Sequence, residues 1–239
     1  MARLSDLVID LAAVLRMEAT TINTYARHLR EAGLLSQGGR GVNAAQVTPL
    51  DAARLLIAMM VDGHAKDAPQ TVRDFGGALL FSAKEDEQPA ELNMQTLLGL
   101  NLGCSLEQFI AAMINVWADD EKRAVIFDYS PEYLAAMTVD IDSVSVSASC
   151  YVKYGVYEFH SRQFVEASEG MERGDYAAGR PYTEMSDRYF RGLRRKTRIS
   201  VGELHRVGEL IGGHRDAGIL PSEEEQLNDL LASIGKPAK

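Results

Sequence analysis

Apolar and polar positions alternate most regularly in the first sixty residues. An apolar stripe at helical spacing predicts a helix over residues 4–15, with Ser5 as its N-cap. A second amphipathic helix is expected over residues 18–32, and Gly33 is placed to end it in a left-handed conformation. The stripe of the first helix consists of Leu4, Leu7, Val8, Leu11 and Leu15.

A glycine-rich loop, residues 36–43, and a strand-like segment, residues 45–48, follow the second helix. A third helix is expected from Pro49 to about residue 62, because Thr48 can cap it and proline suits the first helical position. This order of elements over residues 4–62 resembles a winged helix-turn-helix, a fold class that usually places one helix in the major groove of DNA. The resemblance implies a DNA-binding module.

The periodicity beyond residue 62 predicts several further helices. A helix is expected over residues 71–83, although Gly76 and Gly77 weaken it, and residues 166–182 are interpreted as a loop because they contain glycines and a proline. Three capping boxes, each a serine followed three residues later by Gln or Glu, predict helices over residues 106–117, 201–211 and 227–234.

Between the helices predicted over residues 106–117 and 201–211, apolar residues in segments within residues 124–159 recur at every second position instead of at helical spacing. Strands are expected over residues 124–127, 137–141, 144–150 and 151–159, with a turn or bulge at Asp142–Ser143, where the apolar phase shifts by one residue. The sequence therefore predicts an α+β fold in which the winged helix-turn-helix is followed by a helical segment, a small antiparallel sheet and C-terminal helices. The expected divisions are residues 1–62, 63–187 and 188–239.

Charge is distributed unevenly along the 239 residues, whose net charge is −9. Residues 1–60 carry six basic and five acidic side chains, residues 61–187 carry nine and twenty-two, and residues 188–239 carry ten and seven. Only the two ends are thus suited to a polyanion, and the acidic middle segment is a candidate surface for a protein partner. The N-terminal surplus is so small that dimerisation is expected to gather enough phosphate contacts.

The cellular compartment is inferred from the lack of targeting and membrane-spanning segments in the sequence. The chain has two cysteines far apart in sequence, no apolar leader at its start and no apolar run of membrane-spanning length, which together favour the cytoplasm and no membrane contact.

The second helix carries the candidate base-reading and phosphate-binding groups. Its outward positions hold short or forked donors and acceptors, the side chains that read base edges in the major groove. Arg27 suits a guanine, Asn23 an adenine and Arg30 a phosphate, and Arg40 in the glycine-rich loop suits the backbone or a minor groove. The candidate DNA-binding residues are Thr20, Thr21, Asn23, Thr24, Arg27, His28, Arg30 and Arg40.

A second basic patch lies between residues 188 and 198, interleaved with Tyr189 and Phe190. It is a candidate for tracking phosphates, and the alternative is that its cations pair with the acidic middle segment. The residues of this secondary patch are Arg191, Arg194, Arg195, Lys196 and Arg198.

Enzymatic and metal-binding patterns are absent from the sequence. The five histidines have no ligand spacing, and Asp140 and Asp142 are expected on the solvent side of a strand. No phosphate-binding loop, dinucleotide fingerprint or nucleophile elbow occurs. We therefore expect no enzyme, no cofactor and no metal.

These observations favour sequence-selective binding of double-stranded DNA by a bacterial or phage transcription regulator that acts as a dimer. The alternative is a DNA-packaging or replication adaptor that recruits DNA through the helix-turn-helix and oligomerises through the rest of the chain. A protein-interaction module and an enzyme acting through the sheet rank below these two.

Overall fold

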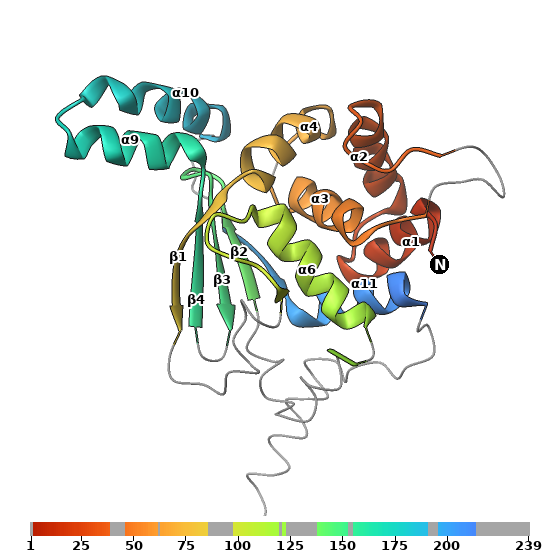
Figure 1. Cartoon of the computed structure of the whole chain (residues 1–239). Helices are drawn as coiled ribbons and strands as arrows, with labels where there is room; N and C mark the ends of the chain where they lie inside the picture. Colours follow the sequence, from red (N-terminus) through yellow and green to blue (C-terminus); the bar gives the residue numbers. More distant parts are fainter. Residues whose placement is uncertain are drawn as a thin grey trace, which may run out of the picture.

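The structure is a computed structural model that describes residues 2–38, 46–61, 63–85, 98–119, 121–122, 138–152, 155–190 and 196–213. Its described residues form one antiparallel sheet of five strands, with most helices on one side of the sheet and a pair of helices at one end of its strands (Figure 1). The predicted α+β class is therefore confirmed. The predicted strand at 124–127 and the predicted helix at 227–234 lie outside the described residues.

Three helices make up the N-terminal part: α1 (Leu4–Val14), α2 (Ala19–Glu31) and α3 (Pro49–Met60). The predicted caps of α3 are confirmed, since the Thr48 side chain accepts from the backbone N–H of Asp51 and Pro49 is the first helical residue. Gly33 has φ of 72°, as expected at the end of α2. The predicted cap of α1 is wrong: the N-cap is Arg3, two residues before Ser5, and its backbone N–H donates to the carboxylate of Asp6.

The sheet has the order β1-β4-β3-β2-β5, and every neighbouring pair is antiparallel. In chain order the strands are β1 (Leu79–Glu85), β2 (Thr138–Asp142), β3 (Ser147–Val152), β4 (Gly155–His160) and β5 (Lys196–Ser200). The predicted turn after Asp142 is confirmed between β2 and β3. Alternate apolar residues of the strands are buried on one face, namely Val139, Ile141, Ala148, Cys150, Tyr157, Phe159 and Ile199. Asp142 at the end of β2 is also buried, so its expected position on the solvent side is wrong.

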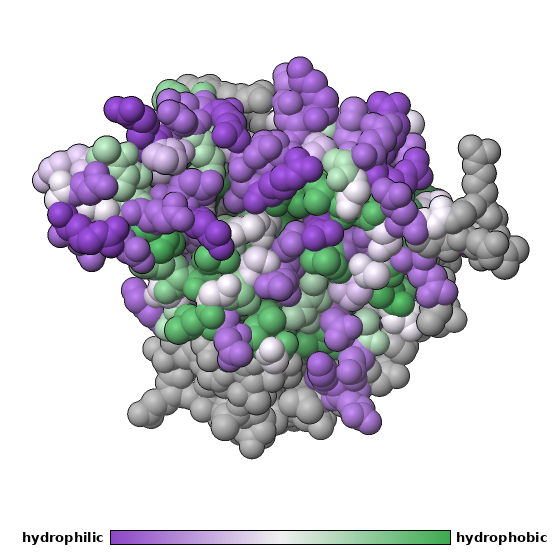
Figure 2. All heavy atoms as spheres, turned by 45° about the horizontal axis from the view of Figure 1, so that its top comes forward, coloured by the Kyte–Doolittle hydropathy of each residue, from purple (hydrophilic) through white to green (hydrophobic). Residues whose placement is uncertain are grey.

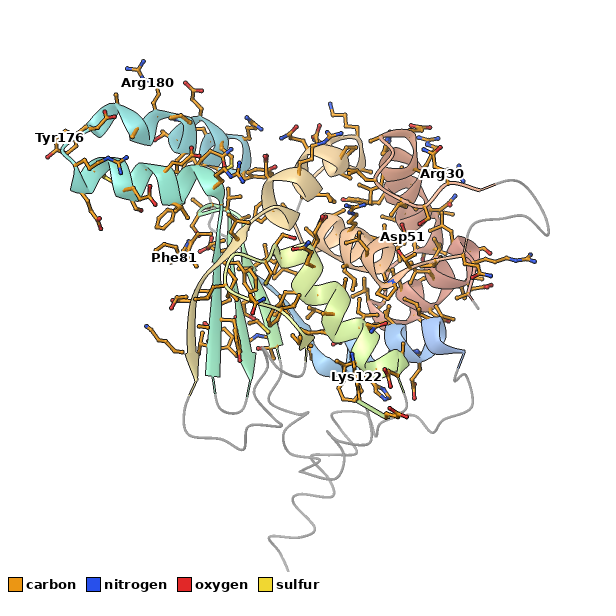
Figure 3. All side chains as sticks on the ribbon, in the orientation of Figure 1. Arg30, Asp51, Phe81, Lys122, Tyr176 and Arg180 are labelled. Carbon is orange, nitrogen blue, oxygen red and sulfur yellow. The ribbon has the colours of Figure 1, made fainter. Side chains whose placement is uncertain are left out.

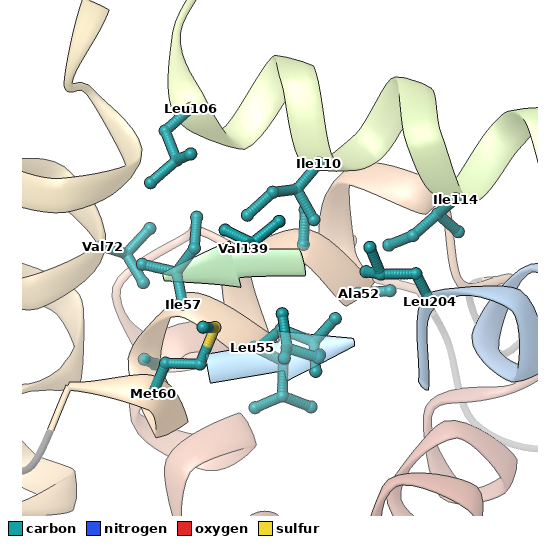
Figure 4. Packing of buried hydrophobic residues seen from close by; sticks show 14 of the residues in the cluster. Ala52, Leu55, Ile57, Met60, Val72, Leu106, Ile110, Ile114, Val139 and Leu204 are labelled. Atoms are coloured by element: carbon teal, nitrogen blue, oxygen red, sulfur yellow. The ribbon is translucent and has the colours of Figure 1, made fainter. Parts of the chain in front are cut away.

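Two long helices, α6 (Leu106–Ala118) and α11 (Val201–Gly212), cover that apolar face together with α3. Figure 4 shows α3, α6, β2 and α11 contributing side chains such as Leu55, Ile110, Val139 and Leu204 to one cluster. The capping boxes predicted to open α6 and α11 are confirmed. One cluster of buried residues includes side chains from Ala2 to Leu210. The predicted division of the chain into domains at residue 62 stays a prediction.

The helix predicted over residues 71–83 is wrong in its second half. A continuous helical stretch runs through η2 (Ala65–Asp67), α4 (Ala68–Thr71) and η3 (Val72–Gly76), where η2 is a 3₁₀ turn and η3 has π-helical bonding. It ends at the glycine pair, and residues 79–85 form β1 instead. Pairing with β4 outweighs the helical pattern there, because the ladder satisfies the backbone and buries Leu80.

The loop predicted over residues 166–182 is also wrong. The structure has α9 (Arg162–Glu172), a short turn η5 (Tyr176–Gly179) and α10 (Arg180–Tyr189), a helical hairpin that we call the arm (Figure 1). Gly170 lies where η5 crosses α9, and a Cβ there would be 2.2 Å from the Cβ of Ala178. The glycines that suggested a loop thus permit close helix packing instead. β5, within the segment interpreted only as basic, was also missed.

Polar contacts at its base fix the arm to the rest of the fold. The hydroxyl of Ser186 donates to the carbonyl of Val144 at 2.6 Å, and the hydroxyl of Tyr189 donates to Asp74 in η3 at 2.7 Å. The tip projects away from the body, where Tyr176 lies at the far end (Figure 3).

Candidate nucleic-acid interface

Helix α2 lies at the surface because only one of its faces is apolar. Ile22, Ala26 and Leu29 recur at helical spacing and are completely buried against the core. Truncating a buried residue such as Ile22 or Leu29 to alanine costs about 2–5 kcal/mol, so this seam holds the helix in place. The remaining faces of α2 are therefore presented outward in a fixed orientation.

The structure places the sequence-predicted residues of α2 on these outward faces. Thr20, Thr21, Asn23, Arg27 and Arg30 are exposed, whereas Thr24 and His28 are partly buried. Figure 3 shows Arg30 on the side of α2 that carries the chain into the following loop. Arg40 belongs to a segment outside the described residues.

Two of these side chains share the carboxylate of Glu31, which is not among the predicted site residues. The Nε atom of Arg27 lies 3.8 Å from one oxygen of Glu31, and Nδ1 of His28 lies 3.6 Å from the other. Helical spacing of three and four residues is the signal that could have identified Glu31. Thr24 is also engaged, since its hydroxyl donates to the carbonyl of Thr20 at 2.8 Å.

The chain that leaves α2 is anchored by α3. A carboxylate oxygen of Asp51, which is buried, accepts the N–H of Ser36 at 2.7 Å, and the guanidinium of Arg54 donates to the carbonyl of Leu34 at 2.9 Å. Arg54 also forms a two-bond ion pair with Glu107 of α6, at 2.9 and 3.1 Å. These contacts connect α2, α3 and the helical layer over the sheet.

The segment that enters α3 returns beside the start of α1. Gln46 forms an antiparallel bridge with Arg3, and the N–H of Val47 donates to the carbonyl of Ala2 at 3.0 Å. The two ends of the loop between α2 and α3 are thus fixed on the same side of the N-terminal helices.

The secondary basic patch is described only in part. Arg191, Arg194 and Arg195 and the side chain of Lys196 lie outside the description, and Arg198 is in β5. Its guanidinium forms bonds of 2.7 and 2.8 Å with both carboxylate oxygens of Asp140 on β2, and this raises the pKa of Arg198. Arg198 is therefore engaged by the acidic middle segment, which is the alternative considered from the sequence.

The cysteines and Asp142, whose side chains could in principle take part in chemistry, lie in surroundings that favour a structural role. Burial raises the pKa of the thiols of Cys104 and Cys150, which disfavours the reactive thiolate. Asp142 is buried, and its carboxylate accepts the N–H of Val144 at 3.1 Å. Within the described ranges, no group of three or more His, Cys, Asp or Glu side chains is arranged to hold a metal ion.

Comparison of the chain with models of protein families, with curated proteins and with solved structures gives no match. Among the helices that the structure describes, none is both long enough and apolar enough to cross a membrane.

Proposed function

We propose that the chain binds double-stranded DNA as a transcription regulator in the cytoplasm, with α2 in the major groove. The observation that carries this proposal is the polar face of α2, where Thr20, Thr21, Asn23, Arg27 and Arg30 are exposed while the opposite face is completely buried. A major groove admits one α-helix, and forked or short polar side chains on it can reach base edges.

The arrangement around α2 supports the winged helix-turn-helix proposal. Residues 15–18 join α1 to α2, and this short connection turns at Arg16, whose φ is 51°. The bridge between Arg3 and Gln46 holds one end of the following loop beside α1, in a position suited to a wing. Arg40 within that loop is proposed to contact the DNA backbone or a minor groove.

A dimer is part of the proposal because one copy carries few cations around α2. Two copies related by a two-fold axis would read half-sites about 34 Å apart, one helical turn of DNA. The molar mass of the protein in solution, free and on DNA, tests this assembly. A ring of many copies would instead favour the packaging or replication adaptor.

Fluorescence anisotropy tests the proposed function directly. Wild-type protein is titrated onto labelled genomic fragments at low and moderate salt, and bound fragments are then sequenced to define a site. We expect Arg27→Ala to weaken binding to that site by about 1–3 kcal/mol, because the arginine is proposed to read a base. Arg180→Ala, on the arm far from Arg30 in Figure 3, is the matched control and should bind normally. Absence of any salt-dependent affinity in the wild type would refute the proposal.

A further inference from the structure

The helical stretch of residues 65–76 lies directly beside α2. Helix α2 contacts both η2 and α4, and the hydroxyl of Tyr25 in α2 donates to the carbonyl of Gly63 at 2.8 Å. Figure 1 shows α4 next to α2 along the same side of the molecule. A ligand that covers α2 on the side of Tyr25 would therefore lie close to this stretch.

One face of residues 65–76 is buried and the other is basic. Ala68, Thr71, Val72 and Phe75 are buried at helical spacing against the core. The opposite positions, also at helical spacing, are exposed and consist of Lys66, Gln70 and Arg73. Both cations thus point outward from an element whose inner face is fixed.

The carboxylates near this face leave a positive balance. Asp74 has only 9% of its side chain exposed, and it accepts from Tyr189 at 2.7 Å and from Arg188 at 3.2 Å. Asp67 is exposed and opposes the two cations. Because Arg188 is paired with Asp74, Lys66 and Arg73 remain against Asp67, a balance of one positive charge. Hydrophilic side chains, with apolar patches between them, lie along the surface from the arm across α4 to α2 (Figure 2).

We propose that Lys66 and Arg73 bind phosphates of the DNA strand that borders the groove occupied by α2, an inference that rests on the proposed function. Long cationic side chains beside a groove-binding helix meet the sugar-phosphate backbone, which runs along both edges of the groove. Such contacts position the protein on DNA without reading sequence. Residues 65–76 therefore supply affinity, while the polar face of α2 supplies selectivity.

Salt-dependent binding of the full-length protein separates these two roles. Lys66→Gln, Arg73→Gln and the double variant are titrated onto a labelled duplex of random sequence, and onto the selected site, at several salt concentrations. Each lost phosphate contact should reduce the slope of log affinity against log salt by about 0.9. Between 50 and 200 mM salt, the wild-type loss of affinity should exceed that of each single variant by about 3.5-fold, equally on both duplexes.

Arg180→Gln provides the control, because it removes the same charge from the arm and should leave the slope unchanged. Thermal unfolding should be unaffected in all variants, since the replaced side chains are exposed. If the double variant keeps the wild-type dependence of log affinity on log salt, this inference is overturned. If the separate Arg27→Ala variant nevertheless binds the selected site more weakly than the wild type, the proposed function still stands. Lack of DNA binding by the wild type would overturn both.

Discussion

Replacement of Gly208 by alanine tests the close crossing of α11 and α6. Gly208 lies in α11 where that helix meets α6, and a Cβ built there would be 2.4 Å from the Cβ of Trp117 and 2.6 Å from the carbonyl oxygen of Ile114. Ordinary contacts of a Cβ are 3.4–4 Å, so α11 would have to move away by about an ångström. Neither obstructing atom can rotate aside, because both are fixed by the backbone of α6.

The expected cost follows from two opposing effects. Overpacking a dense core costs about 1–3 kcal/mol and occasionally more, and the fixed obstacles place this site at or above the upper end. Alanine gains about 1 kcal/mol over glycine in helix propensity. We therefore expect Gly208→Ala to lower the free energy of unfolding by about 2 kcal/mol.

The same substitution at Gly202 is the matched control within α11. The nearest atom to a Cβ there is the Ser200 hydroxyl oxygen at 3.6 Å, which is ordinary contact. Only the propensity effect remains, so Gly202→Ala should stabilise the protein by up to about 1 kcal/mol. In thermal unfolding, each kcal/mol shifts the midpoint by about 2–4 °C for a chain of this size. Midpoints shifted upward in both variants would refute the close crossing of α6 and α11.

Three further predictions concern charged and titratable side chains. Glu107→Ala should reduce the free energy of unfolding by about 2–3 kcal/mol, because it removes the ion-pair partner of the largely buried Arg54. Urea unfolding measures this, and replacing both residues by Met and Leu should restore most of the loss. Glu31→Gln should tighten DNA binding about two- to threefold in anisotropy titrations by releasing Arg27, and weaker binding would contradict this role. Desolvation lowers the pKa of His160, so the unfolded chain takes up a proton near pH 6.5 before the folded chain does, and stability falls as the pH drops below that value. His160→Phe should lose less stability than the wild type between pH 7 and 5, and parallel pH profiles of urea unfolding would contradict this.

Local signals explain which parts of the fold could be predicted. The starts of α3, α6 and α11 depend on side chains within four residues of the helix end, as with Thr48 and Asp51. The alternation in β2 and β3 likewise reflects one buried face within each strand. Such features need no knowledge of distant residues, and the sequence contains them in full.

Non-local contacts explain the errors. Strand β1 exists because Leu80 pairs with Phe159, which is almost eighty residues away. The sequence near Leu80 does not indicate that partner. The arm was interpreted as a loop for a related reason. Gly170 reduces helix propensity locally, but its lack of a side chain allows Ala178 to approach, and this gain appears only when η5 is in place.

The candidate interface likewise contains residues that local patterns predict and residues whose position depends on distant contacts. The outward position of Asn23 and Arg27 follows from the apolar period of α2, and the neighbouring Glu31 was recognisable from its spacing. The proximity of residues 65–76 to α2 was not predictable, because it arises from packing of α2 against η2 and α4. A basic side chain such as Lys66 gains its proposed role only from this juxtaposition.

The contacts of α3 limit how the proposed DNA binding could be regulated. Asp51 holds the chain leaving α2, and Arg54 joins that chain to Glu107 on the helical layer that covers the sheet. Rotation of α2 relative to the sheet would break these partly buried polar contacts and open the shared core, each at a cost of several kcal/mol. An effector that binds the sheet region therefore cannot turn α2 as an independent unit. In the proposed dimer, such an effector would instead have to change how the two copies are placed relative to each other, and so the spacing between their α2 helices.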